Sequence, residues 1–254
     1  MELEAAKMIG AGLAAIALAG AGVGIGLIFG NYLSGAMRNP SAAQKQFPNL
    51  LLGFALAEAT GLFGLVVALM IYAIGNVSGA HINPAVTIPM MIHKKIDVGN
   101  GISYIIFQIL GAIIAAATHA IVLPMGSEIK YALNTPGQFN GVTFNDSTVF
   151  AMEMLLTFLL VFVIFGTAVN KKSPSGWAGF AIGMTVAIGH FIGLSVSGAS
   201  MNPVRTFGPA VISSLQGLEG AFQSHYIYWI APILGGILAG LVYNYIIMSK
   251  KDRE

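Results

Sequence analysis

The sequence of 254 residues contains no cysteine and very little charge. Without cysteine, disulfides, thiolate catalysis and Cys-ligated metal sites are excluded. Only 9% of the residues are Asp, Glu, Lys or Arg, against about 25% in an average soluble domain. The 12 basic residues are scattered and give a net charge of only +2, which argues against a nucleic-acid partner. These shortages leave little from which to build a soluble enzyme or a nucleic-acid-binding domain.

Metal-binding and catalytic patterns are also missing from the sequence. The five His and ten acidic residues include no HExxH or similar spacing. We therefore expect no metal ion, no cofactor and no catalytic residues. The N-terminus is not a typical signal peptide, because its charges (Glu2, Glu4 and Lys7) are mainly acidic and the following apolar run exceeds 7–15 residues.

Apolar residues and glycine are abundant instead. Hydrophobic residues make up 56% of the chain, and its 32 glycines allow helices to pack closely inside a bilayer. A membrane span needs about 20 mostly apolar residues, and six segments qualify: roughly 8–36, 50–75, 101–123, 147–169, 177–197 and 226–248. The composition predicts an all-α polytopic membrane protein with six transmembrane helices.

Two further apolar segments, 83–93 and 202–213, are too short to cross the membrane, and each begins with Asn-Pro. Segments of this kind suit re-entrant half-helices, which protein or water surrounds at membrane depth. They lie in an internal repeat: SGAHINPAVT (78–87) matches SGASMNPVRT (197–206), and the following spans match as YIIFQILGAIIAA (104–116) and YWIAPILGGILAG (228–240). An odd number of crossings separates the copies, so the repeat is inverted, with the function expected near the midplane.

The Asn-Pro pairs have a physical meaning at a helix start. Asn83 and Asn202 can cap the first backbone N–H groups, and Pro84 and Pro203 have no N–H to leave unpaired. Two such helices that meet end to end place two positive dipole ends at one point, which repels a cation or a travelling proton. A single Asn-Pro is usually an ordinary helix cap in a loop, but two copies in matched contexts favour a pore for neutral molecules.

From about Phe63 to the C-terminus the chain resembles the aquaporin (major intrinsic protein) family. The resemblance rests on two signature boxes, Asn83-Pro84-Ala85 and Asn202-Pro203-Val204. It implies a passive channel for water and other small neutral solutes, with no chemical step. Val204 departs from the family's usual Ala, and a bulkier residue there bears on the range of solutes.

The resemblance also implies a four-residue constriction, formed here by Phe63, His190, Ala199 and Arg205. An aromatic residue, a His, a small residue and an Arg resemble the water-selective version of this filter. Glycerol-conducting relatives usually have Gly at the position of His190 and Asp at that of Thr206. Taken alone, Phe63 is more often a packing residue and His190 a satisfied interior His, whereas an arginine in an apolar setting usually faces a water-filled cavity.

Glu153 begins the segment EMLLTF, which resembles a fourth-helix motif of the same family. The family's carboxylate at this position braces a pore loop. The family's first helix should carry a similar Glu-containing motif, but residues 5–40 contain no acidic residue.

Residues 1–72 resemble a different family, the proton-carrying ring protein of a rotary ATP synthase, known as its c component. Glycines alternate at positions 20, 22, 24 and 26, and Arg38-Asn39-Pro40 precedes the segment FALAEATG (54–61). The resemblance implies that Glu58 binds and releases a proton at membrane depth. Alternatively, the glycines serve only close packing in a membrane bundle.

The chain therefore looks like a join, with the crossover within residues 63–71. We expect residues 1–72 to form a c-like helical hairpin that stands in for aquaporin helices 1 and 2, and residues 63–254 to form the pore region. The resemblances imply a homotetramer if the chain is aquaporin-like and a ring oligomer if it is c-like. A proton-translocating component of the ATP synthase c-ring that uses Glu58 is the alternative function.

The distribution of Lys and Arg predicts the orientation in the membrane. Seven basic residues fall on one side of a six-span protein: Lys94, Lys95, Lys171, Lys172, Lys250, Lys251 and Arg253. That side, with the C-terminus, is predicted to be cytoplasmic, in a multi-pass protein of the cell (inner) membrane. Arg38 and Lys45 then lie outside, against the trend.

Overall fold

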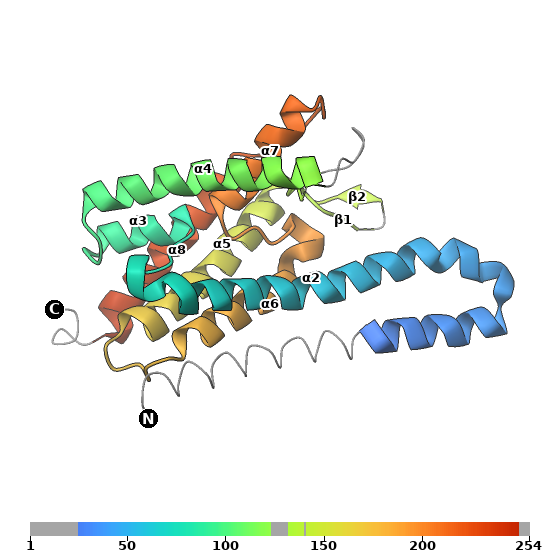
Figure 1. Ribbon diagram of the computed structural model, residues 1–254, viewed down its shortest axis with the longest axis horizontal. Coiled ribbons are helices and arrows are strands. Elements are labelled where there is room, and N and C mark those ends of the chain that lie inside the picture. The colour runs from blue at the N-terminus through green and yellow to red at the C-terminus, as the bar shows by residue number, and fades with distance from the viewer. Residues whose placement is uncertain (1–24, 123–131, 140, 249–254) are drawn as a thin grey trace. The chain divides into compact units, whose positions relative to one another are not determined.

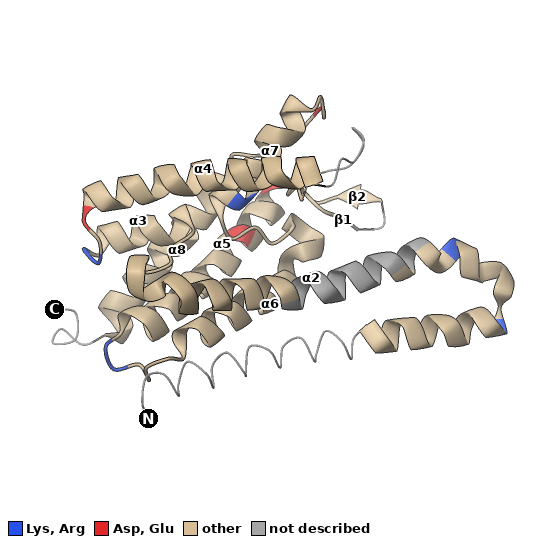
Figure 2. Cartoon of the chain, viewed as in Figure 1, with Lys and Arg blue, Asp and Glu red and all other residues tan. Residues whose placement is uncertain are grey.

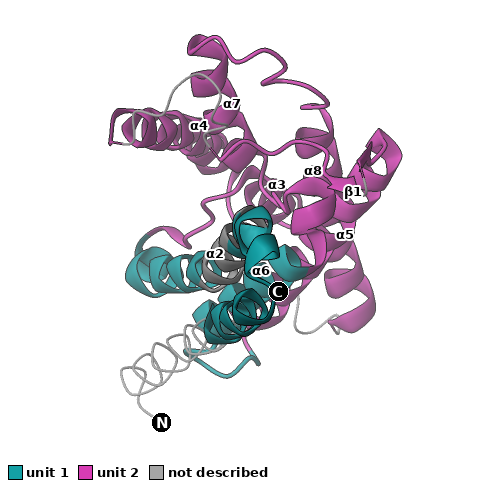
Figure 3. Ribbon diagram, turned by 90° about the vertical axis from the view of Figure 1, so that its right-hand side faces the viewer, with its two compact units in different colours: residues 1–77, 172–191 teal, residues 78–171, 192–254 magenta. Residues whose placement is uncertain are grey.

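The computed structural model describes residues 25–122, 132–139 and 141–248 (Figure 1). Residues 25–38 are helical, and the elements that follow are α2 (Pro40–Ser78), α3 (Pro84–Ile92), α4 (Val98–Val122), β1 (Gln138–Phe139), β2 (Val142–Thr143), α5 (Asp146–Ile164), η1 (Phe165–Val169), α6 (Ala178–Ser197), α7 (Pro203–Leu215), α8 (Ile227–Val242) and η2 (Tyr243–Ile247). The chain divides into two compact units, residues 1–77 with 172–191 and residues 78–171 with 192–254 (Figure 3).

Four helical segments of the described chain are long and apolar enough to cross a membrane: Val98–Val122, Asp146–Val169, Ala178–Ser197 and Ile227–Ile247. They coincide with four of the six predicted spans. The predicted span 50–75 lies within α2, where Leu62–Ser78 is a shorter apolar helix. Most of the predicted span 8–36 lies outside the described residues. Figure 2 shows few charged residues along the described helices, in keeping with the predicted polytopic membrane fold.

Helix α2 begins ten residues before the predicted apolar span. Pro40 is its first residue, where the missing N–H costs nothing. The residues that follow are good helix formers although they are polar. With 39 residues α2 is about 58 Å long at 1.5 Å per residue, so it exceeds the roughly 30 Å of a bilayer's hydrocarbon core. Hydropathy marks the membrane-embedded part of such a helix and not its start.

In the first unit, α2 packs closely against the part of α6 that belongs to this unit. A Cβ on Gly64 would collide with the carbonyl oxygen of Gly183, and a Cβ on Gly183 would collide with that of Gly64. Tyr72 joins the same two segments, since its hydroxyl accepts from the Phe180 N–H at 3.0 Å and donates to the Gly176 carbonyl at 3.1 Å. The two helices are in contact along their small residues.

In the second unit, each half-helix packs against the span of the other repeat. Gly236 on α8 approaches α3 so closely that a Cβ would collide with the Ala85 carbonyl. Gly208 on α7 approaches α4 in the same way, at the Ala112 carbonyl. Helix α5 packs along α8 through a buried cluster that comprises Val149, Ile227, Tyr228 and Ala231. The inverted repeat predicted from the sequence is thus visible in the crossed pairing of α3 with α8 and of α7 with α4.

A short hairpin is the one non-helical feature among the described elements. β1 pairs with β2 in antiparallel register, with Gln138 opposite Thr143 and Phe139 opposite Val142. It lies in the connection 126–146, which the sequence marked only as a polar break. Gly137, just before β1, donates its N–H to the Val196 carbonyl at 2.9 Å. The hairpin therefore fastens this connection to the loop that enters α7.

Candidate pore site

Both Asn-Pro pairs begin half-helices, as predicted. The Oδ1 atom of Asn83 accepts from the Ala85 N–H at 2.8 Å and caps α3. The Oδ1 atom of Asn202 accepts from the Val204 N–H at 3.2 Å and caps α7. Each Asn has an extended backbone, and the Pro that follows is the first helical residue. The local sequence alone is sufficient for these two helix starts.

The loops before the two half-helices repeat one unusual backbone conformation. Three residues of each loop have positive φ angles: Gly79, Ala80 and Ile82 at 75°, 49° and 43°, and Gly198, Ala199 and Met201 at 77°, 47° and 52°. A left-handed conformation costs about 1–2 kcal/mol for a residue with a Cβ. Two residues in each loop carry this cost, so both loops need interactions with the surrounding structure to hold them.

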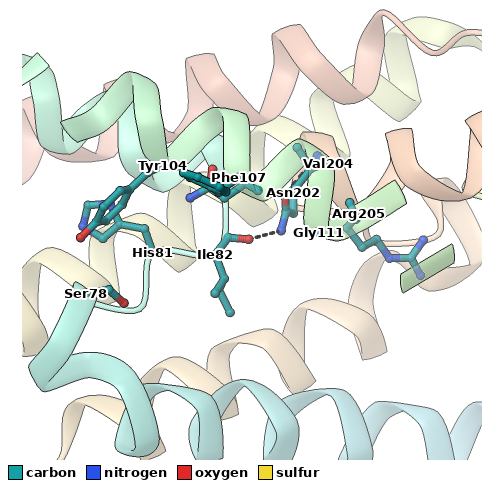
Figure 4. Close-up of a pocket in the computed structure, with 11 residues that line it drawn as sticks. Ser78, His81, Ile82, Tyr104, Phe107, Gly111, Asn202, Val204 and Arg205 are labelled. Carbon is teal, nitrogen blue, oxygen red and sulfur yellow. Dashed lines mark hydrogen bonds between the residues drawn. The ribbon is translucent and has the colours of Figure 1, made fainter. Parts of the chain in front are cut away.

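The two loops are joined to each other at the helix starts (Figure 4). The Nδ2 atom of Asn83 donates to the Met201 carbonyl at 2.8 Å, and that of Asn202 donates to the Ile82 carbonyl at 3.0 Å. These reciprocal bonds bring the N-termini of α3 and α7 together. Two positive dipole ends consequently lie at one point in the second unit.

A buried carboxylate holds the second loop. Glu153 on α5 has no exposed surface. Its Oε1 atom accepts from the Ser197 hydroxyl at 2.6 Å and from the Ser200 N–H at 2.8 Å, and its Oε2 atom accepts from the Met201 N–H at 2.8 Å. Charge-assisted bonds of this kind are the strong ones. Glu153 thereby fixes the backbone directly before Asn202.

Neutral groups hold the first loop. Ser78 accepts the Ala80 N–H at 3.3 Å, and the Nδ1 atom of His81 lies 3.2 Å from the Thr87 hydroxyl oxygen. Gln108 on α4 donates to the same hydroxyl oxygen at 3.0 Å. The sequence offers this loop no acidic residue between Glu4 and Glu58. The first loop therefore repeats the geometry of the second with weaker support.

Arg205 is anchored by the connection that precedes β1. Its Nη1 atom donates to the Ala132 carbonyl at 2.9 Å and to the Oδ1 atom of Asn134. Asn134 is buried, accepts from the Thr206 hydroxyl at 3.0 Å and donates to the Gly198 carbonyl at 2.9 Å. The sequence analysis missed Asn134. The turn-forming run Asn-Thr-Pro-Gly at 134–137 was its only signal, and that pattern says nothing about an Arg far along the chain.

Two of the residues assigned to the constriction lie together in the first unit. The rings of Phe63 and His190 stack with their centroids 4.9 Å apart. The Nδ1 atom of His190 lies 2.8 Å from the Val186 carbonyl oxygen. Because a carbonyl only accepts, Nδ1 carries a hydrogen, and in the neutral ring Nε2 is an acceptor. The other two residues, Ala199 and Arg205, belong to the second unit, where Ala199 is fully buried.

A pocket of about 530 Å³ lies beside the joined loops in the second unit (Figure 4). Its lining combines apolar side chains with a few polar groups: Ser78, His81, Ile82, Tyr104, Phe107, Gln108, Gly111, Ala112, Asn202, Val204 and Arg205. In the part of the chain that the structure describes, no group of three His, Asp or Glu residues is placed to hold a metal ion. Glu58 lies in α2, and its side chain is outside the described part.

Comparison with known proteins identifies two family patterns. Residues 41–243 match the model of the family described as major intrinsic protein, and residues 9–71 match that of the ATP synthase C-type ring protein. Aquaporin-4 of Mus musculus is 41% identical over 185 residues, which cover 72% of this chain and 54% of that protein. The lens fiber major intrinsic protein of Lithobates pipiens is 41% identical over 189 residues, covering 74% and 68%. The chain thus spans about half the length of the aquaporin-4 relatives it matches.

The fold has a solved counterpart. The aquaglyceroporin from Plasmodium falciparum aligns with a TM-score of 0.65 over 76% of this chain and 82% of that one. Its sequence is only 22% identical to this one. The match therefore supports the fold and says nothing about the solute.

Proposed function

The chain belongs to the major intrinsic protein family, whose members are channels and not enzymes, and on that premise we propose that it conducts water passively across a membrane, with other small neutral solutes, and excludes protons and ions. The observation that carries the proposal is the pair of reciprocal bonds between Asn83 and the Met201 carbonyl and between Asn202 and the Ile82 carbonyl.

These bonds use one N–H of each Asn amide. An amide has two, so each Asn retains a second N–H that can donate to the oxygen of a passing molecule. The joined N-termini of α3 and α7 add a positive potential that disfavours protons and other cations. A neutral molecule with an accepting oxygen is therefore the solute that suits this point. Water is the smallest such molecule.

We assign the constriction to Phe63, His190, Ala199 and Arg205. The stacked rings of Phe63 and His190 support the assignment, because they provide a rigid aromatic wall with an accepting Nε2 atom. The anchors of Arg205 at Ala132 and Asn134 support it as well, because they hold a bulky, positive group in place. His190 and the aromatic Phe63 leave less room than the Gly of glycerol channels, so the assignment favours water over glycerol.

Val204 tunes the passage beside Asn202 in this proposal. It is buried, lines the pocket and stands where the family usually has Ala. Its two additional methyl groups narrow the lumen. We expect Val204→Ala to raise the permeability to glycerol more than that to water.

Osmotic swelling of proteoliposomes tests the proposal. Vesicles with the protein should change volume faster than protein-free vesicles in an osmotic gradient, while a pH dye enclosed in the same vesicles shows no proton flux. Asn202→Leu, which removes both the cap and the donor, should abolish the excess water flux, and Leu62→Ala on exposed surface is the matched control. Water flux equal to that of empty vesicles, or a proton flux in the wild type, would refute the channel.

A second candidate function is favoured by the match of residues 9–71 to the ATP synthase ring-protein family. In that function Glu58 carries a proton within an apolar helix, where an ionisable residue is costly without a role. We expect Glu58→Gln to leave osmotic water permeability nearly unchanged. A proton flux in the wild type that disappears in Glu58→Gln would instead make the c-like hairpin the working part.

We further propose a domain plan and a membrane orientation. Residues 1–72 form the c-like hairpin and residues 63–254 the pore region, in a homotetramer of the cell (inner) membrane with a cytoplasmic C-terminus. Single cysteines introduced into this Cys-free chain at Lys95, Lys171 and Lys251 should all react with an impermeant maleimide from the same side. Labelling of Lys95→Cys and Lys171→Cys from opposite sides would contradict the orientation. Light scattering of the purified protein would check the tetramer.

A further inference from the structure

Helix α4 lacks the cover that its repeat counterpart has. Of the apolar stretch in α4, 6% is buried, against 44% in both Asp146–Val169 and Ile227–Ile247 of the same unit. The inverted repeat makes α4 the counterpart of α8. Helix α8 is covered by α5 through the cluster around Tyr228 and Ala231. No described element of this unit covers α4 in the same way.

The contrast holds residue by residue along one face of the two helices. Four residues of α8 are buried, and the four that match them in α4 are exposed: Ile227, Ala231, Gly235 and Ala239 match Ser103, Phe107, Gly111 and Ala115. A Cβ on Gly235 would collide with the Met154 carbonyl of α5, whereas a Cβ on Gly111 would meet open space. Phe107 is 72% exposed, while Ala231 has no exposed surface.

The place in the repeat identifies the missing cover. In the second repeat, the covering helix α5 directly precedes α6. In the first repeat, the span that directly precedes α2 is residues 8–36, whose first 17 residues lie outside the described part. A helix of residues 8–24 would be about 25 Å long at 1.5 Å per residue, and Ser103 to Ala115 covers about 18 Å of α4. The segment is long enough for the whole face.

Side-chain size points to the same segment. In the second repeat, bulky residues of α5, such as Phe150 and Met154, pack on the small Ala231 and Gly235 of α8. In the first repeat α4 carries the bulky Phe107 where α8 has Ala231, so its partner has to be small. Eleven of the 17 residues from 8 to 24 are Gly or Ala. Small residues of this kind allow helices to approach closely in a membrane.

We propose that residues 8–24 pack as a helix along the Ser103–Ala115 face of α4, with the size relation of the second repeat reversed, and close the pocket beside Tyr104 and Phe107. The glycines then serve close packing onto α4 within one chain. They need no proton-carrying role.

Cysteine cross-linking in this Cys-free chain tests the proposal. Ala115→Cys is combined in turn with Ala11→Cys, Ala15→Cys and Ala19→Cys, and membranes are oxidised before trypsin cuts after Lys94 and Lys95. At least one pair should leave the two halves of the chain joined on a non-reducing gel. Ile102→Cys, exposed on the opposite face of α4, is the matched control and should join with none.

Three results would overturn the proposal. They are the absence of any join, equal joining with Ile102→Cys, and disulfide dimers from the single Ala115→Cys variant, which would indicate a second copy on this face. Labelling of single variants with a lipid-soluble maleimide gives an independent readout. Ala115→Cys should lose the labelling that Ile102→Cys shows, and equal labelling would mean that lipid covers the face.

Discussion

The loops that enter α3 and α7 share a backbone but differ in what holds them. Their matched φ angles agree within 10°. Glu153 braces the second loop with three hydrogen bonds from buried groups, while the first loop relies on Ser78, His81 and Gln108. The same conformation can thus be kept by a charged acceptor or by a few neutral contacts. The difference predicts unequal tolerance of mutation in the two halves.

The half-helices differ in charge as well. Arg205, the third residue of α7, has the buried Val86 as its counterpart in α3. Its guanidinium is bound to the connection 132–134, for which the first repeat offers no equivalent among the described residues. The first half therefore contributes shape and dipole to the site. The second contributes in addition a positive group that can select solutes.

Removal of the charged brace should have the largest effect. Glu153→Ala leaves the Ser197 hydroxyl and the N–H groups of Ser200 and Met201 without an acceptor in a buried place. Each orphaned donor costs about 1–3 kcal/mol, so we expect a large loss of thermal stability in detergent and of water flux. Glu153→Gln retains an acceptor oxygen and should lose less. Equal melting temperatures for wild type and Glu153→Ala would contradict the brace.

The crossed contact between repeats should come next. Gly236→Ala places a methyl group against the Ala85 carbonyl of α3 and should force the helices apart. Overpacking of this kind costs about 1–3 kcal/mol, which should lower the melting temperature and displace Asn83. Gly75→Ala is the matched control, because its methyl group would meet only Ile71 at 3.8 Å. A Gly236→Ala variant as stable as this control would rule out the close approach.

The anchor of Arg205 should affect selectivity more than stability. Asn134→Ala removes an acceptor from the guanidinium and releases the side chain. We expect glycerol or urea permeability to rise in swelling assays, in the direction of the larger change expected for Arg205→Ala. Gln138→Ala, in the nearby hairpin, is the control. Unchanged selectivity in a folded Asn134→Ala protein would show that the anchor is not needed.

Matched serines give the smallest and sharpest contrast. Ser78→Ala removes one long bond to the Ala80 N–H and should cost about 0.5–1.5 kcal/mol. Ser197→Ala removes the equivalent bond and also a partner of the buried Glu153, so it should cost more. Thermal melts of the two variants side by side measure the difference. Equal costs would mean that the carboxylate gives the second loop no extra support.

Features that depend on neighbouring residues were predictable from the sequence. The half-helices, their Asn caps and the spans of α4, α5, α6 and α8 follow from apolar runs and from Asn-Pro pairs. The inverted repeat was visible as matched segments. Glu153 was assigned to a loop through a resemblance to one motif, and its bonds to Ser197, Ser200 and Met201 are what that assignment needs. Local hydrogen bonding and hydropathy decide these features, and both can be read along the chain.

Only the tertiary structure decided which distant groups meet. The bonds from Asn83 to the Met201 carbonyl and from Asn202 to the Ile82 carbonyl join residues 118 and 120 positions apart. The anchor of Arg205 on Asn134 and the uncovered face of α4 around Phe107 were also invisible in the sequence. Such contacts depend on how helices pack in three dimensions, where a glycine or a bulky side chain sets the distance of approach. The sequence by itself determined the parts of the pore, and packing determined how they are held together.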